Sequence, residues 1–281
     1  MATADEAVTT PSDAAVVRRI DDGVAWITLN RPEAGNAITA AMRDQIVVWL
    51  EEASADLAVR VVVLSGTGEK GFCTGADLRS QGPAPVRPVG APDRAVGDAA
   101  RLIRTGWQRL VSAVLDCEKP VIAAVQATAA GGGMHLALAC DLVIAAEEAK
   151  FIEVFIRRGI APDAGGAYLL ARLIGPQKAK ELFFFGDDVP APEAERMGLV
   201  NKVVPRAELM DEVGAWAGRL AAAPTKAISV AKYLTNRALD TDRATAMWDE
   251  AVGQELVTGT EDCREGLTAF AERRPPVFRG W

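Results

Sequence analysis

The stretch that decides the fold is residues 121–140, which read VIAAVQATAAGGGMHLALAC. No formally charged residue lies between Lys119 and Asp141, a length close to that of a bilayer-spanning helix. Three glycines inside one helix would, however, each cost about 1 kcal/mol relative to alanine. A buried strand over 121–125, a turn and a new helix explain the stretch better than a membrane span. We therefore expect no membrane association.

The glycines at 131–133 mark the junction between this strand and this helix. Glycine lets the backbone approach a ligand closely, and the start of a helix points unpaired N–H groups toward whatever binds there. Such a site suits an anion, or a carbonyl oxygen that becomes anionic during a reaction. The alternative is that these glycines only allow a close crossing of strand and helix.

The regions on either side of this stretch alternate between strand and helix patterns. Further strands are expected at 24–29, 59–64 and 142–146, and helices are expected from Thr39, which could act as an N-cap, and over 99–115. After Asp163 the pattern is mainly helical, with helices expected at 165–175, 176–185, 191–197, 206–222, 224–239 and 241–273. This order predicts an α/β fold with a helical C-terminal region.

The organisation expected along the chain is a flexible N-terminal tail over 1–15, a core over 16–204 and a helical region over 205–281. Within the core, residues 81–97 are rich in proline and glycine and are expected to form a lid, a binding loop or a disordered segment. The N-terminal residues show neither an apolar signal core nor a basic transit pattern.

Composition excludes several classes of function. The 281 residues carry a formal net charge of −7, which argues against nucleic-acid binding because such proteins show a basic surface. One histidine excludes metal sites that need two, so no metal centre is expected. The four cysteines are widely spaced and are expected to be reduced thiols in a cytoplasmic protein; they are Cys73, Cys117, Cys140 and Cys263.

A second glycine motif, Gly66 to Gly71, matches the G-x-G-x-x-G pattern of dinucleotide sites and follows a strand. The motif should open an apolar helix, but Phe72 to Gly75 continue irregularly. The sequence therefore favours a tight turn here over a nucleotide site.

Several of these segments together resemble the enoyl-CoA hydratase/isomerase family, also called the crotonase family. The resemblance covers about residues 16–275 and rests on the segments 27–32, 36–38, 72–78, 119–125, 130–133, 140–142, 159–166 and 194–200. It implies a spiral of ββα units, with C-terminal helices that form a homotrimer or a dimer of trimers. It also implies a coenzyme A thioester substrate, with coenzyme A as part of the substrate and no separate cofactor.

The resemblance assigns roles to backbone groups at five positions. The amides of Ala76 and Gly132 would form the oxyanion hole that stabilises a thioester enolate. Main-chain groups at Ala37, Asp77 and Leu78 would contact the coenzyme A portion. Preorganised donors aimed at a developing oxyanion are worth roughly 3–4 kcal/mol each, which fits such a role.

The chain departs from the family's hydratases at both catalytic glutamates. The first glutamate position is His135 and the second is Phe155, which makes ordinary two-glutamate hydration doubtful. A carboxylate stands instead at Asp163, where several isomerase branches of the family have a catalytic aspartate. The segment 151–163 most resembles the ring-epoxide isomerases of phenylacetate degradation. The alternative for Asp163 is an N-cap of a helix that begins at Ala164.

His135 and Glu153 remain open at this point. His135 falls on the first turn of a helix, where it should face the thioester pocket as a neutral imidazole, or it is a packed side chain. Glu153 is expected to be a solvated loop acid, and a catalytic role is the weaker alternative.

Three hypotheses follow. The first is an acyl-CoA double-bond or ring isomerase that uses Asp163. The second is a hydratase or hydrolase variant in which His135 activates water. The third is an acyl-CoA-binding protein without catalysis.

Overall fold

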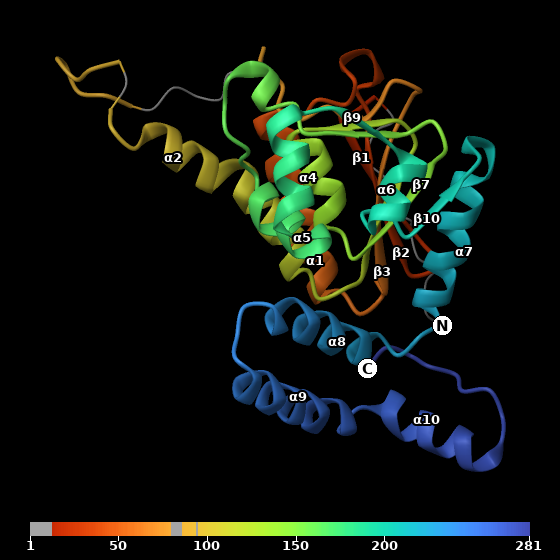
Figure 1. Cartoon of the computed structure of the whole chain (residues 1–281). Coiled ribbons are helices and arrows are strands. Elements are labelled where there is room, and N and C mark those ends of the chain that lie inside the picture. Colours follow the sequence, from red (N-terminus) through yellow and green to blue (C-terminus); the bar gives the residue numbers. More distant parts are fainter. Residues whose placement is uncertain (1–12, 80–85, 94) are drawn as a thin grey trace.

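The computed structural model describes residues 13–79, 86–93 and 95–281, which form two β-sheets covered by helices (Figure 1). The large sheet has the order β1 (Val16–Asp21), β2 (Val24–Leu29), β3 (Val61–Gly66), β5 (Val121–Val125), β7 (Leu142–Ala146), β10 (Lys202–Val204). The small sheet has the order β4 (Gly71–Cys73), β6 (Thr128–Ala130), β8 (Lys150–Ile152), β9 (Asp188–Pro190). The pairs β1–β2 and β8–β9 are antiparallel, and the other pairs are parallel.

The chain steps from the large sheet to the small sheet three times. Each of β3, β5 and β7 is followed by a short strand of the small sheet, namely β4, β6 and β8, and then by helical structure. The helices after these steps are α2 (Asp98–Ile103) and α3 (Arg109–Asp116), then α4 (Gly132–Ala139), then α5 (Gly166–Phe185). The predicted spiral of ββα units is therefore confirmed.

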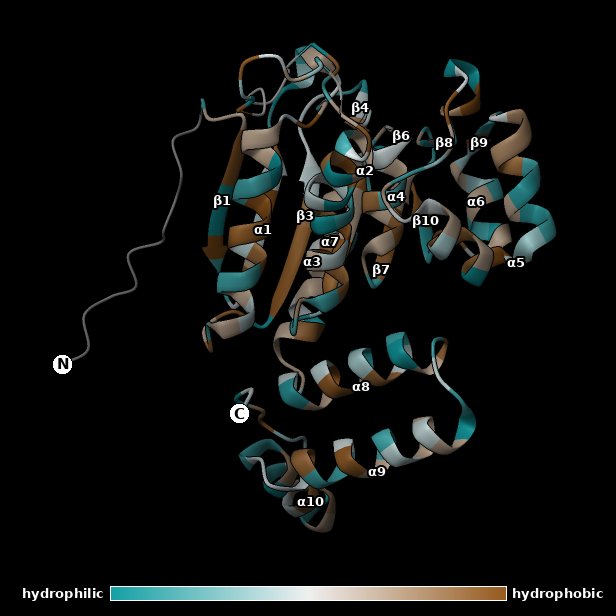
Figure 2. Cartoon of the chain, turned by 90° about the vertical axis from the view of Figure 1, so that its left-hand side faces the viewer, coloured by the Kyte–Doolittle hydropathy of each residue, from teal (hydrophilic) through white to brown (hydrophobic). Residues whose placement is uncertain are grey.

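Both faces of the large sheet are buried, which explains its continuous apolar strands. On β3, Val62 and Leu64 join the core beneath α1 (Ala40–Ala55), α3 and α4, whereas Val61 and Val63 pack with α7 (Leu209–Ala221) on the opposite face. Figure 2 shows β3 hydrophobic along its length. The strand pattern of period two thus assigns alternate side chains to two different cores.

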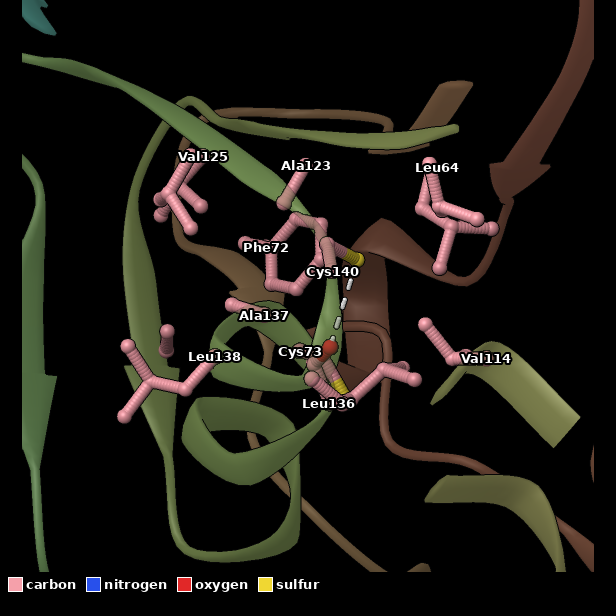
Figure 3. Close-up of a cluster of buried hydrophobic side chains, with 14 of the residues drawn as sticks. Leu64, Phe72, Cys73, Val114, Ala123, Val125, Leu136, Ala137, Leu138 and Cys140 are labelled. Atoms are coloured by element: carbon pink, nitrogen blue, oxygen red, sulfur yellow. Dashed lines mark hydrogen bonds between the residues drawn. The ribbon is translucent and has the colours of Figure 1, made fainter. Parts of the chain in front are cut away.

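The stretch 121–140 lies at the centre of the molecule. Ala123 and Val125 of β5 meet Phe72 of β4 and Leu136 of α4 in one buried cluster (Figure 3). All eight residues of α4 are buried, and the Cys140 thiol donates a hydrogen bond to the Leu136 carbonyl at 3.4 Å. The predicted order of strand, turn and helix is confirmed. No helix of the described residues is long and apolar enough to cross a membrane.

Several expected elements agree with the structure. The strands at 24–29, 121–125 and 142–146 have the predicted bounds, and the Thr39 hydroxyl caps α1 by accepting a hydrogen bond from the Met42 amide. Gly66 ends β3 and Gly71 begins β4, and the four residues between them make the short connection from one strand to the next, so the prediction of a tight turn is confirmed.

Other expected elements differ. The helix predicted at 99–115 is interrupted by a π-helical segment (Arg104–Gln108) with non-helical torsions at Gly106, and Leu102 before it is exposed. The helix predicted at 241–273 is two helices, α9 (Arg243–Thr258) and α10 (Glu261–Glu272), because Thr260 caps the second. The six-residue strand β1 and the three-residue strands β4, β6, β8, β9 and β10 were not expected from the sequence pattern.

The last helices lie apart from the two sheets in Figure 1. The hairpin of α8 (Thr225–Ala238) and α9 is held to the core by Lys232, whose ammonium lies 2.9 Å from the Asp141 carboxylate and donates to the Val114 and Lys119 carbonyls. The remaining helix, α6 (Ala191–Met197), joins β9 to β10. The expected flexible tail falls mostly on residues 1–12, and the expected loop over 81–97 falls partly on 81–85 and 94; these lie outside the described residues.

Candidate active site

The β-bridge between Ile38 and Ala76 fixes the direction in which the Ala76 N–H group points. Ile38 and Ala76 form a parallel β-bridge, in which the Ile38 amide donates to the Gly75 carbonyl at 2.9 Å and the Asp77 amide donates to the Ile38 carbonyl at 3.0 Å. Because these bonds use the groups on either side of Ala76, the Ala76 amide itself points away from Ile38.

The second amide of interest belongs to Gly132, the first residue of α4. An N–H in the first turn of a helix has no acceptor within the helix. A Cβ atom placed on Gly75 would lie 3.6 Å from the Gly132 nitrogen and 3.2 Å from the Ala130 carbonyl oxygen. The segments that carry the Ala76 and Gly132 amides are therefore adjacent, as an oxyanion hole requires.

Close packing also explains the glycines at this junction. A Cβ on Gly133 would lie 2.0 Å from the Cys73 carbonyl oxygen, and a Cβ on Gly132 would lie 2.9 Å from the Trp107 ring. Gly131 has a positive φ of 55° where β6 turns into α4. The close crossing of strand and helix is thus real, and it is the same feature that brings the two amide segments together.

Asp163 lies in the loop that precedes α5. That helix begins at Gly166 and its N-cap is Gly165, without a side-chain hydrogen bond, so the alternative of Asp163 as the helix cap is wrong. The positive φ of Ala164, 49°, turns the chain between Asp163 and the helix. Desolvation raises the pKa of the Asp163 carboxyl, and the charge of His135 opposes that shift.

His135 is completely buried on the first turn of α4. Its Nε2 atom lies 2.8 Å from Glu153 Oε1, and its ring stacks on Phe155 with a centroid separation of 5.3 Å and an interplanar angle of 13°. A Cβ on Gly166 would lie 2.1 Å from the imidazole, so the glycine leaves the space that the ring occupies. In the structure His135 is a packed side chain, and the amide of Gly166, the residue its ring lies against, donates a hydrogen bond to the Asp163 carbonyl at 3.0 Å.

Glu153 is not the solvated loop acid that the sequence favoured. It is 2% exposed and follows the buried end of β8, where it accepts the hydrogen bond of His135. His135 Nδ1 and Glu153 Oε2 are buried and have no hydrogen-bond partner in this structure. The signal in the sequence was one acidic residue inside an apolar run, between Phe151-Ile152 and Val154-Phe155.

The positions expected to contact coenzyme A lie near Arg31, which the sequence reasoning did not single out. One guanidinium nitrogen, Nη1, donates to the Ala37 carbonyl and to the Asp77 carboxylate, each at 2.8 Å. Leu78 is 74% exposed. Arg31 therefore joins the segments of Ala37 and Asp77 and neutralises the aspartate, which leaves an anionic ligand less repelled there.

The described residues contain no group of three or more His, Cys, Asp or Glu side chains that could hold a metal ion. What they contain is two adjacent backbone amides, a desolvated carboxyl and a buried histidine–glutamate pair. A ββα spiral thus brings groups that can exchange protons into the same region as two neighbouring backbone amide segments.

Comparison with known proteins identifies the group. The family model described as Enoyl-CoA hydratase/isomerase matches residues 19–280, and the chain belongs to this family. Its fold is accordingly the crotonase fold: an enoyl-CoA hydratase of Bacillus anthracis has a TM-score of 0.83 at 32% identity, with 99% of this chain and 100% of that one covered.

Relatives in the family carry different activities in their names. A crotonyl-CoA hydratase of Syntrophomonas wolfei is 37% identical over 263 residues, which cover 94% of this chain and 97% of the relative. A 1,2-epoxyphenylacetyl-CoA isomerase of Escherichia coli is 35% identical over 265 residues, which cover 94% and 98%. The Bacillus subtilis protein YngF, whose name places it among the hydratases/isomerases, is 40% identical over 261 residues, covering 92% and 96%. Hydratase names are the more numerous, so these likenesses do not separate the two reactions.

Proposed function

We propose that the protein is an acyl-CoA isomerase in which Asp163 moves a proton along the acyl chain. The observation that carries the proposal is the occupancy of the two hydratase glutamate positions. His135 and Phe155 are buried there and stacked on each other. The Glu153 carboxylate beside them is fully buried and engaged by His135, whereas Asp163 is only partly buried. Asp163 is thus the carboxyl group best placed to meet a substrate.

The chemistry needs one carboxylate and one stabilised oxyanion. The Asp163 carboxylate takes a proton from the acyl carbon alpha to the thioester, or from the gamma carbon. The electrons of that C–H bond delocalise onto the thioester oxygen, which the Ala76 and Gly132 amides would stabilise as a dienolate. The Asp163 carboxyl then returns the proton at the other end, and the double bond moves by one position. A raised pKa favours the return step because it brings the carboxyl closer to neutral pH.

The test is the Asp163→Asn variant with a 3-enoyl-CoA substrate, followed by formation of the conjugated 2-enoyl-CoA. We expect kcat to fall by about 10²–10⁴, the usual contribution of a general acid–base group, with little change in KM. Asp187→Asn, at an exposed position, is the matched control and should keep wild-type turnover. Full isomerase turnover in Asp163→Asn would overturn the proposal.

A second candidate is hydration, favoured by the 2.8 Å contact that lets Glu153 orient His135 as a base. It predicts that crotonyl-CoA is hydrated by the wild type and that His135→Asn abolishes this hydration. The isomerase proposal predicts instead that Asp163→Asn is the more damaging change. A wild-type protein that binds acyl-CoA but turns over neither substrate would leave the third hypothesis, binding without catalysis.

We also propose that the protein forms a homotrimer or a dimer of trimers through its C-terminal helices. Support comes from the apolar side chains that α8, α9 and α10 expose, and from a groove of about 860 Å³ between α8 and α9. The exposed side chains are Tyr233, Met247, Trp248, Val252, Leu256, Leu267 and Phe270. Light scattering coupled to size-exclusion chromatography should give three or six times the chain mass of 29.7 kDa. A monomer mass at micromolar concentration would contradict this proposal.

A further inference from the structure

We infer that the glycine turn over 66–71 anchors two side-chain amides, those of Asn36 and Gln126. Anchored there, these side chains keep the backbone amides of Ala76 and Gly132 at the separation that the proposed oxyanion hole needs. Asn36 and Gln126 are positioning residues, because they act through the backbone and do not themselves touch the substrate. The inference rests on the proposed function, which supplies the role of the two backbone amides.

The two side chains meet at the carbonyl of Gly71. Asn36 Nδ2 donates a hydrogen bond to it at 2.7 Å, and Gln126 Nε2 donates to it at 2.9 Å. Asn36 Nδ2 also donates to the Thr67 carbonyl at 2.9 Å. A Cβ atom on Gly66 would lie 2.8 Å from Asn36 Nδ2 and 2.9 Å from Gln126 Nε2. The missing side chain of Gly66 therefore leaves the space that both amides occupy.

Asn36 suits this place both in its side chain and in its backbone. It is completely buried, and its Oδ1 atom accepts a hydrogen bond from the Arg31 amide at 2.8 Å while Nδ2 makes the two donor bonds. Its φ of 56° is left-handed, a conformation that asparagine adopts more readily than most residues. A carboxylate has no N–H to donate, so aspartate would leave the Thr67 and Gly71 carbonyls without these bonds.

The segment around Asn36 holds the part of the chain that carries Ala76. The carbonyl of Gly35 accepts hydrogen bonds from the Thr74 amide at 3.2 Å and from the Thr74 hydroxyl at 3.1 Å. Ile38, two residues after Asn36, forms the β-bridge with Ala76. Asn36 lies between these two sets of bonds, so its position sets the position of the Ala76 amide.

Gln126 is connected in a similar way to Gly132. It lies between β5 and β6, and β6 pairs with β4 and ends two residues before Gly132. The Oε1 atom of Gln126 is buried and has no hydrogen-bond partner within the described residues, so the bond from Nε2 to the turn is what orients this amide. The turn thereby fixes the start of the short segment that leads to Gly132.

Both amide-bearing segments are thus tied to one carbonyl group. A Cβ atom on Gly75 would lie 3.6 Å from the Gly132 nitrogen, so the segments that end at this carbonyl also run close together at the proposed site. Donors stabilise an oxyanion within about 2.7–3.1 Å of it, so a small shift of either segment weakens the pair.

The same contacts explain the glycines that match a dinucleotide motif. Each of the three glycines has a residue of the segment 31–38 close to where its Cβ atom would lie: Gly66 has Asn36 at 2.8 Å, Gly68 has Pro32 at 2.6 Å and Gly71 has Gly35 at 2.7 Å. The motif therefore serves contact between two parts of the chain.

The test is the stretching frequency of the thioester carbonyl in bound butyryl-CoA, which has no double bond to move. Infrared difference spectra between ¹³C-labelled and unlabelled butyryl-CoA isolate this one band. In the wild type the frequency should lie below that of free butyryl-CoA, because two N–H donors polarise the carbonyl. An unlowered frequency in the wild type would overturn the inference.

Two variants remove the anchored amides one at a time. Asn36→Gly deletes the side chain and keeps the left-handed backbone, and Gln126→Met keeps the length of the side chain without its donor. Each should lower the carbonyl frequency less than the wild type does. A purely structural role would change stability and leave the frequency of the bound thioester as it is, and that result would overturn the inference. Gln126→Met decides by itself if Asn36→Gly does not fold.

Turnover of a 3-enoyl-CoA supplies the second readout. We expect kcat to fall by up to about 10²-fold in each variant, the loss that a misplacement of about 1 Å can cause, with little change in KM. The double variant should lose less than the product of the two single losses, because Asn36 and Gln126 share one acceptor. A raised KM with wild-type kcat would contradict the inference.

Asn201→Ala is the matched control. Asn201 also uses its side chain to bond the backbone, with Oδ1 accepting from the Val143 amide at 2.7 Å, but it does so between β7 and β10. It should leave the carbonyl frequency and kcat unchanged. A change as large as that in Asn36→Gly would show that any loss of such a bond loosens the site, which would overturn the inference.

The inference and the proposed function fail separately. Full turnover in Asp163→Asn removes the proposed isomerase mechanism, while the carbonyl frequency still tests Asn36 and Gln126. An inactive Asp163→Asn together with a wild-type carbonyl frequency in both amide variants removes only the role of the turn.

Discussion

The two halves of the candidate site are built from different material. One half consists of backbone amides, at Ala76 and Gly132, held by strand β4 and the start of α4. The other half consists of side chains, at His135, Glu153 and Asp163: Glu153 is hydrogen-bonded to the histidine, and Asp163 lies in the loop before Gly166, whose backbone closes against the histidine ring. By the resemblance given in the sequence analysis, the first half corresponds to the family's oxyanion hole, and the second half has His135 and Phe155 where hydratases have glutamates.

This difference has a physical cause. The amide half depends on backbone passing backbone at Gly133 and Cys73, where there is no room for a side chain. The side-chain half lies in a slot where an imidazole, a phenyl ring and a carboxylate fit together, and a different set of side chains can fill such a slot. An enolate site can therefore keep its oxyanion stabilisation while its acid–base groups change.

The largest expected effect tests the rigidity of the amide half. In Gly133→Ala the new methyl group would lie 2.0 Å from the Cys73 carbonyl oxygen, so β4 and α4 must separate. We expect a loss of more than about 3 kcal/mol in the free energy of unfolding, beyond the usual cost of overpacking, together with loss of activity. Denaturant unfolding followed by circular dichroism gives the measurement.

Gly214→Ala is the matched control, since a Cβ there meets nothing within 4 Å on helix α7. It should raise the free energy of unfolding by about 0.5–1 kcal/mol, the helix propensity difference between the two residues. If Gly133→Ala unfolds with the same free energy as the wild type, then the close backbone contact between β4 and α4 is not what makes the amide half rigid.

A smaller effect is expected from Gly166→Ala, which tests the side-chain half. The methyl group would lie 2.1 Å from the imidazole, so the ring must move and its bond to Glu153 must break. Because a side chain can yield where a backbone cannot, we expect a loss of about 1–3 kcal/mol in the free energy of unfolding. The His135→Ala/Gly166→Ala double variant should recover part of that loss, since the ring is absent. A Gly166→Ala protein with unchanged stability and unchanged imidazole NMR signals would contradict this account of the slot.

Much of the fold could be predicted from the sequence, for reasons that are local. The strands at 121–125 and 142–146 were found with their bounds because apolar runs ended by turns mark strands buried on both faces. The sequence pattern did not predict the break between α9 and α10 at Thr260, nor the π-helical segment within the helix expected over 99–115. A capping residue such as Thr260 can end one helix and begin another while the apolar residues keep the same spacing. A π-helical turn such as the one at Gly106 changes which side of the helix the following residues lie on.

The sequence by itself determined the family and placed His135, Phe155 and Asp163 at positions that the family resemblance singles out. These depend on residue identity and on spacing along the chain. Only the tertiary structure decided that Glu153 is buried against His135 and that Asp163 does not cap α5. A carboxylate on a segment between apolar residues can face water or the interior. Which it does depends on where α4 and α5 place their own side chains, and no local pattern records that.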